Sequence, residues 1–279
     1  MPTPTPHDSL VILPTYNEVD NLEPLVTEVL ERPGFDLVVI DDNSPDGTGE
    51  LAERLGGRWP DRMRTLHCPG KRGLGKALLR GFRYALATGH EHIFQMDADL
   101  SHDPARLPDL RMTLDTADVV IGSRYCAGGG TDGWTPWRHA LSRMGSVYAG
   151  LVLGLPIKDL TGGYKGFRRQ VLEAMDLNSI KSTGYAFQVE MTYHCVRHGF
   201  RIEEVPITFA ERRHGHSKMS TRIVMEALLV VAQLRLTGPV PLSHSRAHIH
   251  IPSRRALATT QVMAPPLQDG LAVRRRRRT

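Results

Sequence analysis

Short apolar runs alternate with segments of helical spacing along most of this chain, and this alternation is the feature that most restricts its fold. Runs at 10–13, 37–40 and 93–96 have the length and character of buried strands, and the leucines and valines of 22–30 recur at the spacing of an amphipathic helix. A later strand is predicted at 118–125. Strands that alternate with helices form parallel sheets, because each helix returns the chain to the same edge. The sequence therefore predicts an α/β fold with a mostly parallel central sheet covered by helices on both faces.

Polar residues follow the first two runs at the point where each predicted strand ends. The first run is followed by residues 14–18, with Tyr16 at their centre, and the second by Asp41 and Asp42. Ligands of open α/β sheets bind at the carboxyl ends of the strands, where an acidic residue after the second strand commonly binds a ribose or a base. We expect Tyr16 to lie beneath a nucleotide base; the alternative for this segment is a simple helix cap by Asn17.

The run at 93–96 ends in two carboxylates one residue apart, Asp97 and Asp99, with Ala98 between them. Both side chains can turn toward one hard divalent cation. Mg²⁺ or Mn²⁺ bound by one or two carboxylates, with phosphate oxygens at other positions, is typical of proteins that handle nucleotides. Two aspartates near a strand end also occur by chance, so the rest of the chain must support this interpretation.

Basic residues occur at two further places where an anion could bind. Residues 71–77 are rich in glycine and lysine and open a predicted helix, where an anion is favoured; the alternative is a glycine turn with a solvated basic start. Arg124 ends a predicted strand, and Arg138 and Ser142 lie four apart on a helix predicted to run to Leu153. Guanidinium groups bind phosphate oxygens as a bidentate fork, so these residues predict a phosphate cradle.

Composition excludes several other classes of protein. The formal net charge is +5, and Arg274 to Arg278 supply all of that excess, so the folded part is nearly neutral and unsuited to nucleic acid. Cys68, Cys126 and Cys195 are isolated, which fits a reducing compartment and argues against disulfides or a structural zinc. The chain has neither the G-x-G-x-x-G nor the G-x-x-x-x-G-K-[ST] pattern of dinucleotide and P-loop enzymes.

The two ends of the chain are predicted to be flexible. Residues 1–8 lack the basic start and apolar core of a secretory signal peptide, and 239–279 are rich in proline, serine and arginine, which predicts a disordered basic tail. The run at 223–236 contains charged residues and falls short of the ~20 apolar residues that a membrane span needs. We expect residues 9–238 to form one catalytic domain located in the cytoplasm.

Nine sequence blocks stand in a fixed order along the chain: PTYNE, DDNSPDGT, GKRGLGKA, DADLSHDP, GSRY, W-x3-R-x3-S, GYKGFR, GYAFQVE and F-x2-R-x2-G-x-SKM. This array resembles that of the polyprenol-phosphate mannose synthases (dolichyl-phosphate mannosyltransferases) of glycosyltransferase family 2. The resemblance extends from about Leu10 to Leu236.

The resemblance implies a GT-A fold and an inverting transfer of mannose from GDP-mannose to a polyprenyl phosphate, with Mg²⁺ or Mn²⁺ as the cofactor. Residues of this chain that would bind the donor are Pro14, Tyr16, Glu18, Ile40, Asp42, Asp97, Ala98, Arg212 and Lys218. Residues that would act in catalysis are Asp99, Arg124, Arg138 and Ser142, the last three of them around the acceptor phosphate. Arg212 and Lys218 match residues that close over the donor.

The chain departs from the family pattern in two places. Asp97 and Asp99 match metal ligands, but Ser101 stands where some relatives have a glutamine ligand, so its shorter hydroxyl is a weaker candidate. Some relatives continue into transmembrane helices where this chain has its basic tail. A lipid acceptor would then be met at the cytoplasmic membrane surface or through a separate membrane-anchoring protein.

Two alternative functions are compatible with parts of the pattern. A polyprenyl-phosphate transferase for glucose or another sugar would share the metal and phosphate sites. A basic nucleic-acid-binding protein that has lost catalysis would instead use Arg274 to Arg278. Acidic and basic groups are expected together at one sheet edge, as in an enzyme site. This favours an enzyme over a nucleic-acid-binding protein, and we expect no nucleic-acid partner.

Overall fold

The computed structural model describes residues 7–182, 184–211 and 221–237. Within them, seven strands form one sheet in the order β3-β2-β1-β4-β7-β5-β8. Their bounds are β1 Ser9–Thr15, β2 Phe35–Asp41, β3 Met63–His67, β4 His92–Gln95, β5 Val119–Ser123, β7 Lys165–Arg168 and β8 Ile202–Pro206. Neighbouring strands are parallel except that β7 is antiparallel to both β4 and β5, which confirms the mostly parallel sheet. Two short strands, β6 Gly130–Thr131 and β9 Thr208–Phe209, pair beside it.

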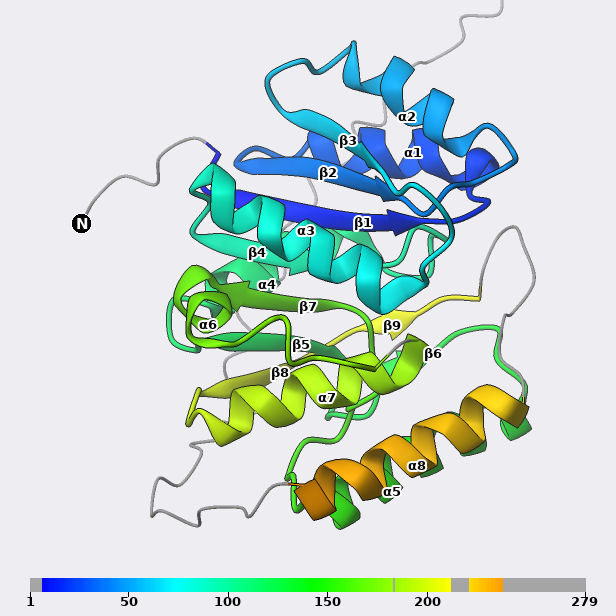
Figure 1. The fold of residues 1–279 in the computed structure, drawn as a ribbon, viewed down its shortest axis with the longest axis vertical. Coiled ribbons are helices and arrows are strands. Elements are labelled where there is room, and N and C mark those ends of the chain that lie inside the picture. Colours follow the sequence, from blue (N-terminus) through cyan, green and yellow to red (C-terminus); the bar gives the residue numbers. More distant parts are fainter. Residues whose placement is uncertain (1–6, 183, 212–220, 238–279) are drawn as a thin grey trace, which may run out of the picture. The chain divides into compact units, whose positions relative to one another are not determined.

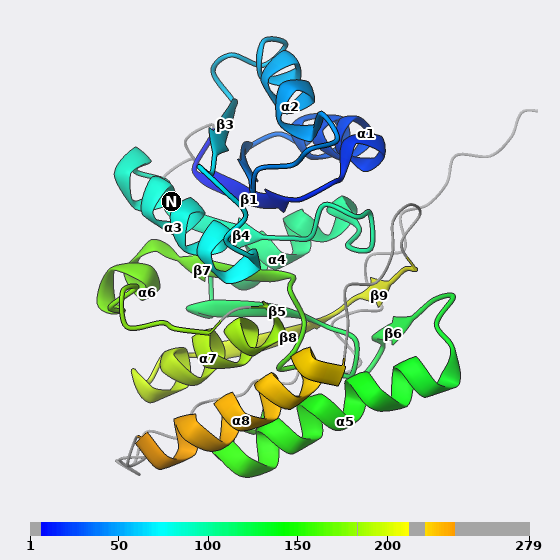
Figure 2. The same ribbon diagram turned by 45° about the vertical axis from the view of Figure 1, so that its right-hand side comes forward.

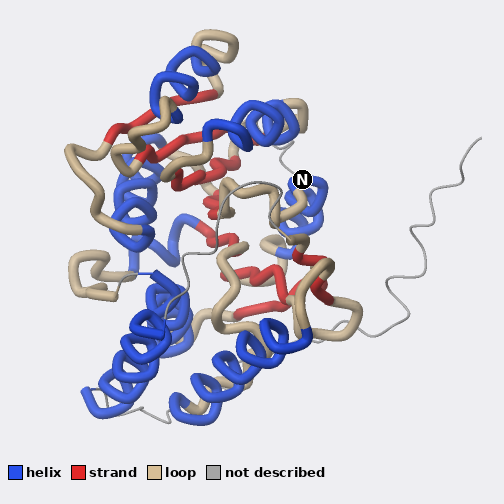
Figure 3. The backbone as a smooth tube through the Cα atoms, turned by 90° about the vertical axis from the view of Figure 1, so that its right-hand side faces the viewer, coloured by secondary structure: helices blue, strands red, loops and turns tan. Residues whose placement is uncertain are grey.

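Helices cover both faces of the sheet, as Figures 1 and 3 show. On one face lie α1 Val19–Leu30, α2 Thr48–Gly56 and α4 Leu107–Thr113, the last preceded by the 3₁₀ turn Pro104–Arg106; on the other lie α3 Leu74–Thr88, α6 Arg169–Ala174 and α7 Gly184–Arg197. Side chains alternate along each strand, so that Val11 packs into the core on the α1 face and Ile12 into the core on the α3 face.

The helices approach the sheet closely where the sequence allows it. The apolar positions of α1 that the spacing predicted, Leu22, Leu25, Val26, Val29 and Leu30, are all buried. On the other face, a Cβ added to Gly81 of α3 would lie 2.4 Å from Ile12 of β1. Only glycine therefore permits this contact between helix and strand.

Two long helices, α5 Pro136–Leu153 and α8 Thr221–Thr237, lie side by side next to α7 (Figures 1 and 2). The Tyr148 hydroxyl of α5 donates to the carbonyl of Leu228 at 3.2 Å, and that of Tyr193 of α7 donates to the carbonyl of Leu234 at 3.3 Å. The apolar run at 223–236 is thus a helix that docks on its own domain. No helix within the described residues combines the length and apolar character needed to cross a bilayer.

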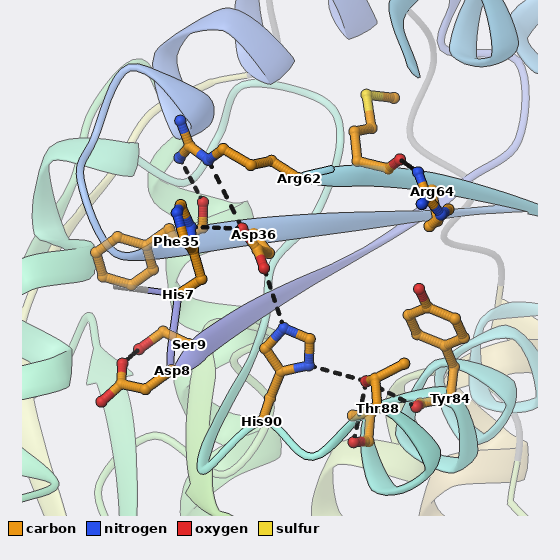
Figure 4. A network of polar contacts seen from close by, with 12 residues as sticks. His7, Asp8, Ser9, Phe35, Asp36, Arg62, Arg64, Tyr84, Thr88 and His90 are labelled. Carbon is orange, nitrogen blue, oxygen red and sulfur yellow. Dashed lines mark hydrogen bonds and ion pairs between the residues drawn. The ribbon is translucent and has the colours of Figure 1, made fainter. Parts of the chain in front are cut away.

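A polar network closes the sheet at the amino ends of its strands (Figure 4). Asp36, at the start of β2, accepts from His7 at 3.0 Å and lies 3.2 Å from the ring nitrogen of His90. Arg62 donates to the carbonyl groups of Leu30 and Phe35, each at 2.7 Å. These side chains bind one another and the backbone, although the buried Nε of Arg62 has no hydrogen-bond partner in the described part of the chain. This edge therefore contributes to stability, whereas ligands of such sheets bind at the opposite, carboxyl edge.

Candidate active site

The acidic residues after β2 are held by the turns around them. Asp42 is 4% exposed, and its two carboxylate oxygens accept from the backbone N–H groups of Arg72 at 2.8 Å and Gly73 at 2.7 Å. For the glycine-rich turn before α3, both an anion site and a simple glycine turn were possible. In the structure it binds the carboxylate of Asp42, which fixes both segments at the carboxyl edge.

The turn after β1 supplies the aromatic and acidic residues expected around a nucleoside. The Lys71 ammonium lies 3.6 Å from the centre of the half-buried Tyr16 ring. Glu18 occupies the cap position of α1 and accepts from the Asn21 amide at 2.9 Å, so the alternative of a cap by Asn17 is wrong. Pro14 is half-buried, but the Ile40 side chain is 0% exposed and offers a ligand no surface.

The two carboxylates that follow β4 differ in exposure. Asp99 is 3% exposed and accepts from both the backbone N–H and the hydroxyl of Ser101. Asp97 is partly exposed, and a Cβ added to Gly163 would lie 3.1 Å from its Oδ1. Ala98, between them, is buried. Gly163 therefore leaves the space that the Asp97 carboxylate occupies.

A buried histidine fixes the backbone of this turn. His102 Nδ1 accepts from the Asp97 N–H at 3.0 Å, and its ring stacks on that of Tyr164 with centroids 4.9 Å apart. Burial lowers the pKa of His102, so the ring is neutral and its proton lies on Nε2, assigned from the hydrogen bond at Nδ1.

The donor set after β4 fits a hard divalent cation bound together with a diphosphate. Among the described residues, no group of three or more histidine, cysteine, aspartate or glutamate side chains is arranged to hold a metal ion. Asp97 and Asp99 can supply two carboxylates, and Mg²⁺ commonly completes such a set with phosphate oxygens and water. The Ser101 hydroxyl is directed at Asp99, so its clearest role is to orient that carboxylate.

Arg124, which directly follows β5, forms a buried ion pair that the sequence did not predict. Its Nε and Nη2 donate to the two oxygens of Asp159, each at 2.7 Å, and Nη2 also donates to Thr161 at 2.9 Å. Burial raises the pKa of Asp159, but the hydrogen bonds and charge of Arg124 outweigh it and lower that pKa overall. The bidentate fork that we expected for phosphate is therefore directed at Asp159.

Arg138 and Ser142 lie on one face of α5, as their spacing predicted, and both line a cavity. Thr135 caps this helix by accepting from the Arg138 N–H at 3.3 Å. The Arg138 guanidinium lies 4.2 Å from the Trp134 ring and donates to Glu211 at 3.2 Å. This arginine is thus held by an aromatic ring and by a carboxylate that is more than half exposed.

The cavity has a volume of about 330 Å³ and changes character along α5. Its polar lining is Asp97, Arg124, Arg138, Ser142, Thr161 and Gln188. Farther along α5 the lining becomes apolar, with Met144, Tyr148 and Ala149 facing Ala227, Leu228 and Val231 of α8. The cavity therefore joins a charged end at the sheet to an apolar channel between two helices.

Comparisons with known proteins place this site in a family. Residues 10–176 match the model of glycosyl transferase family 2. The chain is 45% identical over 233 residues to a polyprenol monophosphomannose synthase of Mycolicibacterium smegmatis, covering 82% of this chain and 88% of that protein. The chain belongs to glycosyltransferase family 2. It is also 45% identical over 230 residues to an undecaprenyl-phosphate mannosyltransferase of Micrococcus luteus, covering 82% of this chain and 94% of that protein.

Solved structures share the fold of this family 2 glycosyltransferase and confirm the predicted GT-A architecture. Glucosyl-3-phosphoglycerate synthase from Mycobacterium tuberculosis, in complex with Mn²⁺, UDP and glucosyl-3-phosphoglycerate, aligns with a TM-score of 0.60 at 18% identity, covering 83% of this chain and 80% of that one. A mannosyltransferase from Pyrobaculum calidifontis, in complex with GDP-Man and Mn²⁺, aligns with a TM-score of 0.51 at 18% identity, covering 82% and 72%.

Two of the expected donor-binding residues of the family 2 enzyme, Arg212 and Lys218, lie outside the described residues, as does the basic tail at 239–279. Sequence reasoning missed Asp159, Gln188 and His102. Gln188 stands within the block GYAFQVE, and Asp159 stands shortly before the block GYKGFR. No local spacing links either residue to the residues that it contacts.

Proposed function

We propose that this glycosyltransferase transfers mannose from GDP-mannose to the phosphate of a polyprenyl phosphate, with inversion, giving polyprenyl-phosphate β-mannose. The observation that carries this proposal is the cavity. It joins the carboxylate of Asp97 and the guanidinium groups of Arg124 and Arg138 to an apolar channel between α5 and α8, and so matches a phosphate on a long apolar chain. The printed names of the two bacterial relatives support the same acceptor and sugar.

In this reaction the protein must position the two substrates and stabilise the charge of the leaving diphosphate. A phosphate monoester has a second pKa of about 6, so the acceptor arrives largely as a dianion and needs no general base. Arg138 and Ser142 orient one phosphate oxygen toward the anomeric carbon. A new carbon–oxygen bond forms there as the bond to the diphosphate breaks, and GDP leaves with the electron pair. Displacement from the opposite face converts the α-linked donor into the β-linked product.

Asp97 and Asp99 would hold Mg²⁺ or Mn²⁺ with the donor diphosphate, and such a cation neutralises the charge of the leaving GDP. Tyr16, Glu18 and Asp42 would surround the nucleoside. We also infer that Arg212 and Lys218 close over the donor. The Mn²⁺ and GDP-Man complexes of the fold relatives are consistent with this assignment.

The α5–α8 pair also suits contact with a membrane surface. Large apolar side chains are exposed on α5 at Trp137, Met144, Val147 and Leu151, and on α8 at Leu229 and Leu236. The sequence of α5 contains no acidic residue, and Arg143 and Arg235 are exposed beside the apolar positions. We infer a peripheral enzyme on the cytoplasmic membrane face, where an amphipathic surface rich in cations binds anionic lipid. Delivery by a separate membrane-anchoring protein is the alternative.

A substrate panel tests the proposed function. The purified chain is incubated with GDP-mannose, GDP-glucose, UDP-glucose or UDP-GlcNAc, polyprenyl phosphate, and Mg²⁺, Mn²⁺ or EDTA. We expect an acid-labile mannolipid from GDP-mannose alone, lost with EDTA. Product from another nucleotide sugar would favour the alternative that this chain transfers glucose or another sugar.

A further inference from the structure

One polar residue of the cavity has no part in the reaction described so far. Gln188, in the second turn of α7, is 2% exposed and lines the cavity together with Asp97 and Gly163. Its neighbours Phe187 and Val189 are buried in the core and already attach this helix to the sheet. An amide at this position therefore needs a reason other than packing.

The sheet fixes the orientation of the Gln188 amide. Gln95 Nε2 donates to the carbonyl of Gly163 at 3.0 Å and to Gln188 Oε1 at 2.6 Å. A backbone carbonyl can only accept, so the Gln95 atom must be the nitrogen and the Gln188 atom it meets must be the oxygen. The Gln188 amide nitrogen is then the part of the side chain that is left for the cavity. Within the described residues it donates to no protein group.

A second sheet residue holds the backbone of Gln188. Lys165 of β7 is the register partner of Gln95 of β4, so both side chains leave the same face of the sheet. Lys165 Nζ donates to the Gln188 carbonyl at 2.8 Å and to the Thr192 hydroxyl at 2.7 Å. Lys165 is wholly buried, and this burial lowers its pKa to about 7.

Burying an amine at this depth is costly unless it is fully hydrogen-bonded, and an apolar side chain would pack at lower cost. Two adjacent sheet side chains nevertheless converge on one glutamine, one on its amide and one on its carbonyl. A side chain that binds a ligand must be held in a fixed position, and these hydrogen bonds hold Gln188 in that way.

We propose that Gln188 determines donor specificity by donating a hydrogen bond to a hydroxyl of the transferred hexose. The inference rests on the proposed function. Gln188 lies on the Asp97 side of the cavity: Gln95 precedes Asp97 by two residues, and Gly163 touches both of them. Arg138 and Ser142 approach from α5. The hexose attached to a diphosphate at Asp97 lies between them, within reach of this amide.

Substrate analogues test this assignment. Gln188→Met removes the amide while keeping the length of the side chain. We compare kcat/KM for GDP-mannose with that for GDP-deoxymannoses that each lack one hydroxyl. The wild type is expected to reject one analogue by roughly 100-fold, because the buried donor is then left unpaired, and Gln188→Met should reject it by only a few-fold. Binding of GDP alone should be unchanged, which also shows that the variant is folded.

Two further variants separate this role from a structural one. Lys165→Met should reduce discrimination against the same analogue, because Lys165 positions Gln188. Gln170→Met, on the exposed surface of α6, is the matched control and should change nothing.

Three outcomes would overturn the assignment of Gln188. They are an unchanged discrimination ratio in Gln188→Met, an equal loss of GDP binding, and a rise confined to the KM for polyprenyl phosphate, which would place the amide on the acceptor. A wild type that makes no mannolipid from GDP-mannose would overturn the proposed function itself, before any variant is compared.

Discussion

The two halves of the sheet hold their functional side chains by different means. On the β2-β1-β4 side, Asp42 accepts from two backbone N–H groups, and Asp99 accepts from the backbone N–H and the hydroxyl of Ser101. On the β7-β5-β8 side, Arg124 pairs with Asp159 and Arg138 with Glu211. Uncharged donors leave a carboxylate its negative charge for a cation, whereas an ion pair balances a guanidinium before any ligand arrives. This difference supports the proposal that the first half binds a metal and nucleotide and that the second positions an acceptor phosphate.

The largest expected effect tests the acidic half. Asp99→Asn keeps the size of the side chain but removes its charge, so turnover should fall by about 1,000-fold, because charge at the leaving diphosphate is no longer balanced. Metal-dependent GDP binding, measured by calorimetry, should weaken in parallel. The control is Asp109→Asn on α4, whose partly exposed carboxylate pairs with Arg106, and this variant should behave as wild type. Undiminished metal dependence in Asp99→Asn would remove this residue from the site.

The second prediction compares the two ion pairs of the other half. Asp159→Asn removes the carboxylate that pairs with the buried Arg124 and should lower the free energy of unfolding by about 3–5 kcal/mol. Glu211→Gln removes the exposed partner of Arg138 and should cost at most about 1 kcal/mol. Urea denaturation of both variants measures the difference. Equal losses would mean that Arg124 does not depend on Asp159 for its position.

The third prediction separates acceptor from donor binding. Arg138→Ala should raise the apparent KM for polyprenyl phosphate by about 10- to 100-fold, the value of a hydrogen bond to a charged group, and lower turnover. Affinity for GDP-mannose should stay nearly intact, since this residue approaches from α5. A similar loss of affinity for GDP-mannose would show that Arg138 also contacts the donor, so that the two halves of the sheet do not bind donor and acceptor separately.

The fourth prediction concerns the exposed apolar positions of α5. Leu151→Glu should reduce flotation with vesicles that contain anionic lipid by about tenfold, because burial of a leucine is worth about 1.5–3 kcal/mol. Activity on a short, water-soluble acceptor should persist. Met112→Glu on α4, where the side chain is also exposed, is the matched control. A chain that ignores anionic vesicles at low salt would require a separate anchoring protein.

Local patterns predicted more of the acidic half than of the other. The strands at 37–40 and 93–96 are followed by carboxylates and the strand at 10–13 by the turn that contains Tyr16, all at one edge. The i,i+4 spacing of Arg138 and Ser142 brought both to the cavity. Each of these predictions uses a period or a strand end that the sequence itself carries. The expected boundaries of the catalytic domain and its tail stay predictions.

Contacts between distant segments could not be predicted in this way. Asp159 is 35 residues from Arg124, Glu211 is 73 from Arg138, and Gln95 is 93 from Gln188. The strand β7 has four residues, too few to indicate that it inserts antiparallel between β4 and β5. That insertion places Lys165 beside Gln95, and it follows from the packing of the whole sheet.

The last prediction is a pH dependence of stability that arises from Lys165. Its pKa is lowered to about 7 by burial, with Cys195, Asp159 and Arg124 as its charged or titratable neighbours. Between about pH 7 and its ordinary pKa near 10.4, the unfolded chain binds a proton here that the folded chain does not, so this site makes the folded protein more stable as pH rises. Relative to Lys165→Met, the wild type should therefore gain up to about 1.4 kcal/mol per pH unit across that range. Urea denaturation of both proteins at pH 7, 8, 9 and 10 measures the gain. A difference that is constant with pH would mean that Lys165 keeps its proton throughout, held by Gln188 and Thr192 more strongly than burial opposes it.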